Sequence, residues 1–217
     1  MPTQPLTTVL FDLDGTLLDS TELILSSYRH TLRSHRGEVP PDEVWIEGLG
    51  TPLRVQFRRF TDDPNEIDAM VATYRDHNLA HHDAMVSAFP GIAEAVRQLM
   101  ERGVKLGIVT SKNRSSTIRG LQSGSLDNLF EVLVTADDVE SPKPDPEPVR
   151  LALEQLDTEA EETVFVGDSP HDLVAGRAAG VATAAVLWTP FRREQLALHR
   201  PDYWIENPAQ LVELAST

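Results

Sequence analysis

The residues of this sequence that are best suited to chemistry stand directly after short apolar runs. Four carboxylates, two hydroxyls and one ammonium group occupy such positions, the lysine within the proline-rich loop "SPKPDP". Carboxylates repel one another and resist burial, so a group of them at strand ends needs a positively charged partner. The candidates are, in chain order, Asp12, Asp14, Thr110, Ser111, Lys143, Asp168 and Asp172.

The chemistry that these groups favour is phosphoryl transfer with a divalent cation. Several carboxylates held together cannot all stay ionised without a cation, and hard oxygen ligands with no Cys or His beside them favour Mg²⁺ over zinc. Lysine and hydroxyl donors suit phosphoryl oxygens, whose charge needs neutralising in the transition state. Asp12 and Asp14 point the same way where a strand ends, and Gly15 permits a sharp turn that brings backbone amides close to a ligand.

The elements that must position these groups alternate along the chain. Six short runs rich in Val, Ile and Leu read as strands buried on both faces, which is typical of parallel sheets. Helical segments follow them, so the pattern predicts an α/β fold with a doubly wound parallel sheet, in which ligands bind outside the carboxyl ends of the strands. The expected strands lie at 7–13, 104–111, 130–137, 162–169, 182–188 and 202–206, and the helices at 91–103, 113–122, 146–156, 170–180 and 207–215.

One stretch breaks this alternation. Between residues 20 and 85 there is no convincing strand, and four segments at 21–35, 40–49, 52–60 and 64–82 carry apolar residues three or four positions apart, as amphipathic helices do. We therefore expect an all-helical insertion at residues 19–86, called the cap below, over an α/β core made of residues 1–18 and 87–217.

Composition excludes several classes of function. The 217 residues include 34 acidic residues against 19 Lys and Arg, a formal net charge of −15, so nucleic-acid and anionic-membrane partners are not expected. Without cysteine there can be no disulfide or thiolate metal site. Residues 1–8 lack the basic and long apolar regions of a signal peptide, and no apolar run reaches membrane-spanning length, so a cytoplasmic location is expected.

The candidate residues, in their order and spacing, resemble the four motifs of the haloacid dehalogenase superfamily of phosphotransferases. The matching stretches are "DLDGT", "VTS", the Lys143 loop and "GDSPHD". The resemblance implies that Asp12 is the nucleophile that forms an aspartyl-phosphate and that Asp14 protonates the leaving oxygen and later activates water. It further implies Mg²⁺ ligation by Asp12, the backbone carbonyl of Asp14, and Asp168, with Asp172 as a further ligand or close by.

The remaining site residues come partly from the same resemblance and partly from the chemistry of their own side chains. Thr110 would hydrogen-bond the phosphoryl oxygens, and Lys143 would neutralise their charge. Gly15 and Thr16 would shape the turn around the phosphoryl group, while Ser111 and Arg54 are further substrate-binding candidates, Arg54 reaching from the cap. Because dehalogenases of the superfamily lack a carboxylate at the position of Asp14, phosphoryl transfer is favoured over dehalogenation.

Stretches of the cap and core, such as "MVATYRDHNLAHHD" and "AGRAAGVATAAVLW", are similar to the bacterial PpaX-type pyrophosphatases, close relatives of the phosphoglycolate phosphatases. That resemblance implies inorganic pyrophosphate as substrate. The chain departs from the group at 19–21, Thr51 and Arg54, so a small phosphate monoester remains an alternative substrate. Phosphoglycolate phosphatase and a β-phosphoglucomutase-type mutase remain alternative activities. A regulatory protein that has lost its chemistry is the alternative from another class. A monomer and a homodimer are both compatible with the sequence.

Four further residues are expected to be structural. His81 and His82 are neighbours on a helix, a poor arrangement for binding one metal ion, and a solvated face is the expectation for both. Asp19 and Ser20 are expected to cap the first helix of the insertion.

Overall fold

The computed structural model describes residues 5–215, so the expectation about the first eight residues lies partly outside it. A six-stranded parallel sheet in the order β5-β4-β1-β6-β7-β8 forms the core, as the sequence predicted. The registers Thr8↔Lys105 and Thr8↔Thr163 place β1 between β4 and β6. The strands are β1 Thr8–Phe11, β4 Lys105–Val109, β5 Val132–Val134, β6 Thr163–Gly167, β7 Ala182–Val186 and β8 Tyr203–Ile205.

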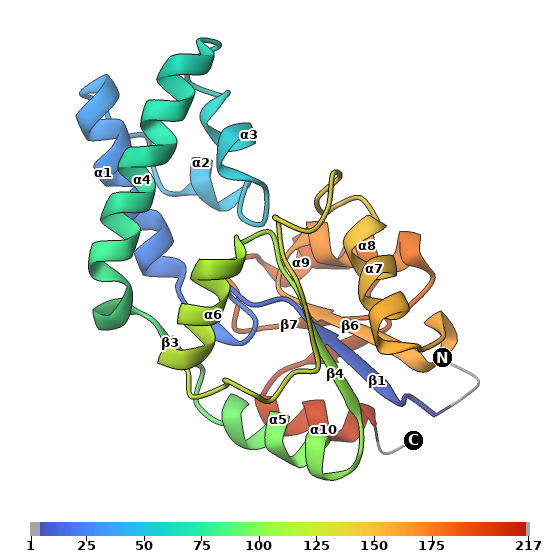
Figure 1. Ribbon diagram of the computed structural model, residues 1–217. Helices are drawn as coiled ribbons and strands as arrows, with labels where there is room; N and C mark the ends of the chain where they lie inside the picture. The colour runs from blue at the N-terminus through green and yellow to red at the C-terminus, as the bar shows by residue number, and fades with distance from the viewer. Residues whose placement is uncertain (1–4, 216–217) are drawn as a thin grey trace.

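The strands are apolar on both faces because helices cover both. Val9 and Phe11 belong to one buried cluster together with residues of α5, α6 and α10, whereas Leu10 belongs to a second cluster with residues of α7 and α8. Figure 1 shows α5 and α10 on one side of the sheet and α7 and α8 on the other. The core helices are α5 Ile92–Glu101, α6 Arg114–Ser123, α7 Glu147–Leu156, α8 Pro170–Ala179, α9 Arg193–Ala197 and α10 Leu211–Leu214.

The cap consists of helices with a core of their own. Trp45 is fully buried there, stacked against Tyr28 with ring centroids 4.3 Å apart and against Phe60 at 4.9 Å. Figure 1 shows the two long helices, α1 and α4, side by side. The cap helices are α1 Thr21–Arg36, α2 Glu43–Ile46, α3 Leu53–Phe57 and α4 Pro64–Met85.

The cap joins the core through a two-stranded antiparallel ribbon that the sequence did not predict. β2 Leu18–Asp19 pairs with β3 Ser87–Ala88, in the register Leu18↔Ala88. The ribbon lies at the two predicted boundaries between core and cap, after residue 18 and after residue 86. Those boundaries stay a prediction. The short helix α9 and the 3₁₀ turn η1 Ala160–Glu162 are also additions to the predicted elements. The 3₁₀ turn η2 Pro208–Gln210 and α10 together occupy the helix predicted at 207–215.

The expectation for His82 was wrong. His81 is exposed, but His82 is buried, because α4 ends against α6: a Cβ on Gly120 would lie 3.9 Å from His82 Nε2. Within residues 5–215, no helix is both long and apolar enough to cross a membrane.

Candidate active site

After β1 ends, the backbone makes a tight turn at Gly15, directly against the carboxylate of Asp168. Asp12 extends the strand ladder by donating its backbone N–H to the carbonyl of Val166, at 2.9 Å. Gly15 then adopts a φ of +84°, and a Cβ at this position would lie 2.4 Å from Asp168 Oδ2. Glycine is therefore required here twice over, for its backbone conformation and for the space that Asp168 fills.

Of the four carboxylates expected at this edge of the sheet, three meet in one cluster. Asp12, Asp168 and Asp172 are all buried, and each offers an oxygen within 4.8 Å of the others. Lys143, only 2% exposed, donates from Nζ to Asp12 Oδ1 at 2.7 Å, to Asp172 Oδ1 at 2.6 Å and to the carbonyl of Val109 at 3.0 Å. The lysine thus fixes the orientation of two of the three carboxylates.

The electrostatic balance of this cluster is negative, since three carboxylates face one ammonium. Burial, with repulsion from Asp172 and Asp14, outweighs the attraction of Lys143 and raises the pKa of Asp12 to about 7. Burial and the neighbouring carboxylates likewise raise the pKa of Asp168 well above its ordinary value. Although burial opposes it, Asp12 and Asp172 raise the pKa of Lys143, so the lysine stays charged. An all-oxygen set of this charge fits a hard divalent cation such as Mg²⁺.

Asp172 has a structural duty as well. Its Oδ2 accepts hydrogen bonds from the backbone N–H and Oγ of Ser169, at 3.0 and 2.7 Å, in a capping box at the start of α8. Asp168 is held from the other side by Thr189, whose Oγ1 donates to Asp168 Oδ2 at 3.1 Å. Thr189 was not predicted; it lies just beyond β7, and no motif in the sequence marks it.

Asp14 occupies a different environment from the acidic cluster. Its Oδ1 accepts hydrogen bonds from Ser20 Oγ at 2.7 Å and from Lys112 Nζ at 2.9 Å. Burial alone would raise its pKa, but Lys112 and Ser20 hold the pKa of Asp14 below its ordinary value. The expectation that Ser20 caps α1 was wrong: its side chain makes no capping bond, because its hydroxyl is committed to Asp14.

The predicted contact of Asp14 with Mg²⁺ is through its backbone carbonyl, and it stays a prediction; the side chain has other partners. The carboxylate of Asp14 is not part of the cluster of three and is held by Ser20 and Lys112 instead. Only its backbone carbonyl is left as a ligand. Lys112 was missed because it is one residue beyond the predicted "VTS" motif, and nothing in its spacing shows that it reaches Asp14.

Hydroxyl groups with unused hydrogen-bonding capacity lie at the ends of the same strands. In the described part of the chain, Thr16 Oγ1 and Ser111 Oγ are buried without a hydrogen-bond partner. Thr110 Oγ1 accepts from the backbone N–H of Lys112 at 3.2 Å, and Trp188 Nε1 donates to the carbonyl of Thr16 at 3.0 Å. Buried hydroxyls are rarely left unpaired, so the first two fit oxygen atoms of a bound ligand.

Arg54 is not brought to this site. Its guanidinium pairs with Asp68, a partner within the cap, and both side chains are more than half exposed. The helix that carries it, α3, is short, and the pairing directs the arginine along the cap surface toward α4.

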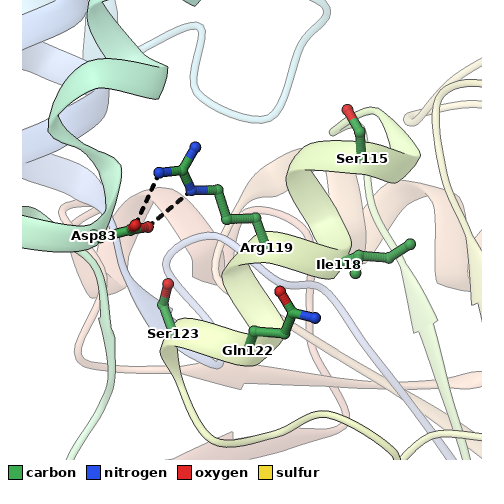
Figure 2. Close-up of a pocket in the computed structure, with 6 residues that line it drawn as sticks. All are labelled: Asp83, Ser115, Ile118, Arg119, Gln122 and Ser123. Carbon is green, nitrogen blue, oxygen red and sulfur yellow. Dashed lines mark hydrogen bonds and ion pairs between the residues drawn. The ribbon is translucent and has the colours of Figure 1, made fainter.

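A separate pocket of about 530 Å³ lies between the end of α4 and α6 (Figure 2). Arg119 on α6 donates two hydrogen bonds of 2.8 Å to the carboxylate of Asp83 on α4. None of the site carboxylates lines this pocket, so it is distinct from the candidate active site.

Comparison with known proteins gives concordant matches over almost the whole chain. The family described as haloacid dehalogenase-like hydrolase matches residues 9–186. Pyrophosphatase PpaX of Anoxybacillus flavithermus is 44% identical over 207 residues, 95% of each chain, and that of Halalkalibacterium halodurans is 43% identical over the same length and share.

Solved structures agree with these sequence matches. A haloacid dehalogenase-like family hydrolase from Streptococcus pneumoniae superposes with a TM-score of 0.82 at 25% identity, covering 96% of this chain and 97% of that one. A protein from Lactobacillus plantarum, provisionally assigned as a phosphoglycolate phosphatase, gives a TM-score of 0.86 at 27% identity, with 97% and 100% covered.

Proposed function

This chain belongs to the haloacid dehalogenase-like hydrolases, and on that premise we propose that it hydrolyses inorganic pyrophosphate with the help of Mg²⁺ and through an aspartyl-phosphate on Asp12. The observation that carries the proposal is the buried cluster of Asp12, Asp168 and Asp172 around Lys143, with Asp14 held apart. The choice of substrate is supported by the pyrophosphatases that match 95% of the chain at more than 40% identity. A small phosphate monoester is the alternative, supported by the resemblance to the Lactobacillus plantarum protein.

In the first step, a carboxylate oxygen of Asp12 attacks the phosphorus of one phosphoryl group. The new P–O bond forms as the bond to the bridging oxygen breaks, and the electron pair leaves with the second phosphate. Asp14, whose pKa lies below its ordinary value in the free protein, has to take up a proton before this step and gives it to that departing oxygen. Because Lys143 binds Asp12 Oδ1, the carboxylate is held in one orientation for this attack.

In the second step, water attacks the phosphorus of the aspartyl-phosphate and loses a proton to Asp14. The bond between phosphorus and the Asp12 oxygen breaks, which releases inorganic phosphate and regenerates both side chains. Lys143, and the unpaired hydroxyls of Thr16 and Ser111, supply charge and hydrogen bonds for phosphoryl oxygens in both steps. Asp12, Asp168, Asp172 and the backbone carbonyl of Asp14 would hold Mg²⁺, which would neutralise the anionic oxygens of the transition state.

The test of the mechanism is Asp12→Asn. We expect phosphate release to fall at least about 10⁴-fold, the scale seen when a catalytic nucleophile is lost, while circular dichroism stays unchanged. Asp127→Asn, an exposed aspartate outside the site, is the matched control and should keep full activity. Turnover by Asp12→Asn at the wild-type rate would exclude the aspartyl-phosphate.

The test of the substrate is a panel of kcat/KM values with Mg²⁺ for pyrophosphate, phosphoglycolate, sugar phosphates and nucleotides. We expect pyrophosphate to give the highest value. A higher value for a monoester would assign the chain to the phosphate-ester phosphatases, and conversion of a sugar phosphate without free phosphate would assign a mutase. Absence of turnover over the whole panel would leave a binding protein without chemistry.

A further inference from the structure

A hollow of about 420 Å³ lies beside α8, outside the candidate active site. Residues of α8 from Leu173 to Ala178 line it on one side, and residues 198–200, which follow α9, line it on the other. None of the site carboxylates lines this hollow, and no step of the proposed reaction uses its residues.

Two exposed aliphatic side chains border the hollow. Leu198 is 79% exposed, more than any other large apolar side chain within residues 5–215, and Val174 is exposed as well. Leu173 is buried and adds apolar surface to the lining. A single exposed aliphatic residue is ordinary on a protein surface, but here two of them border one hollow. The hollow therefore fits an apolar side chain of a ligand.

The ionisable side chains that line the hollow are all basic. They are Arg177, His199 and Arg200, and Arg150 on the neighbouring helix α7 lies close by, because it donates to the carbonyl of Ala178 at 3.1 Å (Figure 1). Arg177 donates to the backbone carbonyl of Arg200. Within residues 5–215, none of the three arginines pairs with a carboxylate, although acidic residues outnumber Lys and Arg by 34 to 19.

We propose that this surface, called the basic hollow below, is a docking site for an acidic segment of a partner protein that carries an apolar side chain. The apolar side chain enters the hollow and packs on Leu198, while carboxylates of the segment pair with the arginines. Guanidinium groups suit this role because they bind carboxylates through two parallel hydrogen bonds. The basic hollow consists of four basic side chains around two aliphatic ones: Arg150, Arg177, His199, Arg200, Val174 and Leu198.

The charge of the whole chain favours a short acidic segment over other anionic partners. Charges at the surface act over about 10 Å at 0.1 M salt, so a short segment responds to the nearby arginines and not to the net charge of −15. An anionic membrane would face a much larger part of this acidic molecule and would be repelled. A second copy of the chain, bound symmetrically through the same surface, would bring two sets of arginines together.

The test is fluorescence anisotropy of the full chain with a short labelled peptide of Glu residues that has one Leu at its centre. We expect saturable binding at low salt that weakens as salt is added. A peptide with Gln for every Glu, and another with Ser for the Leu, should each bind at least about tenfold more weakly. Amide NMR with the first peptide should show the largest shifts in α8 and residues 198–200. Absence of saturable binding at low salt would overturn the proposal.

Two variants of the chain locate the binding. Arg200→Gln removes one charge and should weaken binding about threefold, the scale of an exposed ion pair; within residues 5–215, its side chain has no partner to lose. Leu198→Ser should weaken binding about tenfold, because its apolar contact is lost. The matched controls are Arg75→Gln and Leu79→Ser, an exposed arginine and leucine on α4, which should keep the wild-type affinity.

Three results would contradict the basic hollow as a site for an acidic protein segment. The first is wild-type peptide affinity in both Arg200→Gln and Leu198→Ser. The second is binding of vesicles of phosphatidylserine and phosphatidylcholine that Arg200→Gln abolishes, which would assign the surface to membranes. The third is a dimer in sedimentation that Leu198→Ser dissociates, which would assign it to a second copy of this chain. Phosphate release should stay at the wild-type rate in both variants, since neither residue belongs to the acidic cluster.

Discussion

Two aspartates separated by a single residue differ in their protonation chemistry because their partners differ. Asp12 shares Lys143 with Asp172, and burial raises its pKa to about 7. Asp14 has Lys112 and Ser20 as partners of its own, and its pKa lies below the ordinary value despite burial. Environments that separate the pKa values of neighbouring carboxyl groups are a mark of divided acid–base roles.

Lys112→Met tests whether that lysine sets the protonation of Asp14. Loss of a cation 2.9 Å from Asp14 Oδ1 should raise the pKa of Asp14. Because water attack needs the ionised carboxylate, the acidic limb of the pH profile of kcat should then move to higher pH. Lys112→Arg, which keeps the charge, should restore the wild-type limb. An unmoved acidic limb in Lys112→Met would show that Ser20 and the other surroundings of Asp14 keep its pKa low without Lys112.

Gly15→Ala tests the contact between the turn and Asp168. The new Cβ would have to displace Asp168 Oδ2, so the Mg²⁺ concentration for half-maximal activity should rise at least about tenfold. Gly37→Ala is a matched control, since Gly37 has a φ of +72° but nothing within 4 Å of its Cβ position. It should cost about 1 kcal/mol of stability from backbone strain and leave the Mg²⁺ dependence unchanged. Equal Mg²⁺ dependence in both variants would contradict a steric role for Gly15.

The helices of the cap depend on one aromatic side chain. Trp45 is fully buried between Tyr28 and Phe60, so Trp45→Ala should lower the free energy of unfolding by about 3–5 kcal/mol. Trp45 Nε1 is buried and, within residues 5–215, has no hydrogen-bond partner, so Trp45→Phe loses no bond and should cost less than about 2 kcal/mol.

Hydrogen exchange of Trp45→Ala would also test the predicted boundary between cap and core. Because the cap has its own buried cluster, protection should fall in α1 and α4 while β1 and β6 keep theirs. Protection lost equally over the sheet would mean that residues 19–86 unfold together with the core, and the boundary would be wrong.

The elements that the sequence predicted are those whose burial is uniform along the run. β1 and β6 are buried at every position, and such runs reveal a strand between two layers of helices. Because parallel strands end at the same edge of a sheet, the predicted strand positions also predicted that Asp12, Lys143 and Asp168 lie close together. The two-residue strands β2 and β3 are too short for any periodicity to show.

Contacts that depend on how elements pack were not readable from the sequence. Lys112 reaches Asp14 only because β4 lies beside β1, and Ser20 turns to the same carboxylate at the start of α1. The stack of His30 on His77 likewise depends on the register between α1 and α4. The pattern of a single segment contains no information on such registers.

Across the entire chain, the acidic excess gives a net charge of −15, and the buried cluster adds its own local repulsion to that background. Metal-free protein relieves the repulsion by binding protons. The pKa of Asp12 is raised above its unfolded value of 3.8 to about 7, so its stabilising contribution is present at low pH and is lost as pH rises through 7. Protons and Mg²⁺ therefore compete for the same oxygens.

The competition predicts that Mg²⁺ stabilises the fold more at about pH 8 than at about pH 6. If Mg²⁺ is present at about 100 times its dissociation constant at the higher pH, it adds about 2.7 kcal/mol there. One unit below the pKa of Asp12, protonation weakens binding about tenfold and leaves a gain of about 1.4 kcal/mol. For a chain of this length, each kcal/mol corresponds to about 2–4 °C in Tm.

Melting curves with and without Mg²⁺ at both pH values measure this difference, with Asp168→Asn as the variant that removes one carboxylate from the cluster. The variant should lose most of the Mg²⁺-dependent shift in Tm at either pH, because its asparagine brings no charge to the ion. A shift as large at the lower pH as at the higher would mean that protons do not compete with Mg²⁺ at these carboxylates. The ion would then have to bind elsewhere, and the assignment of Asp12, Asp168 and Asp172 as its ligands would fail.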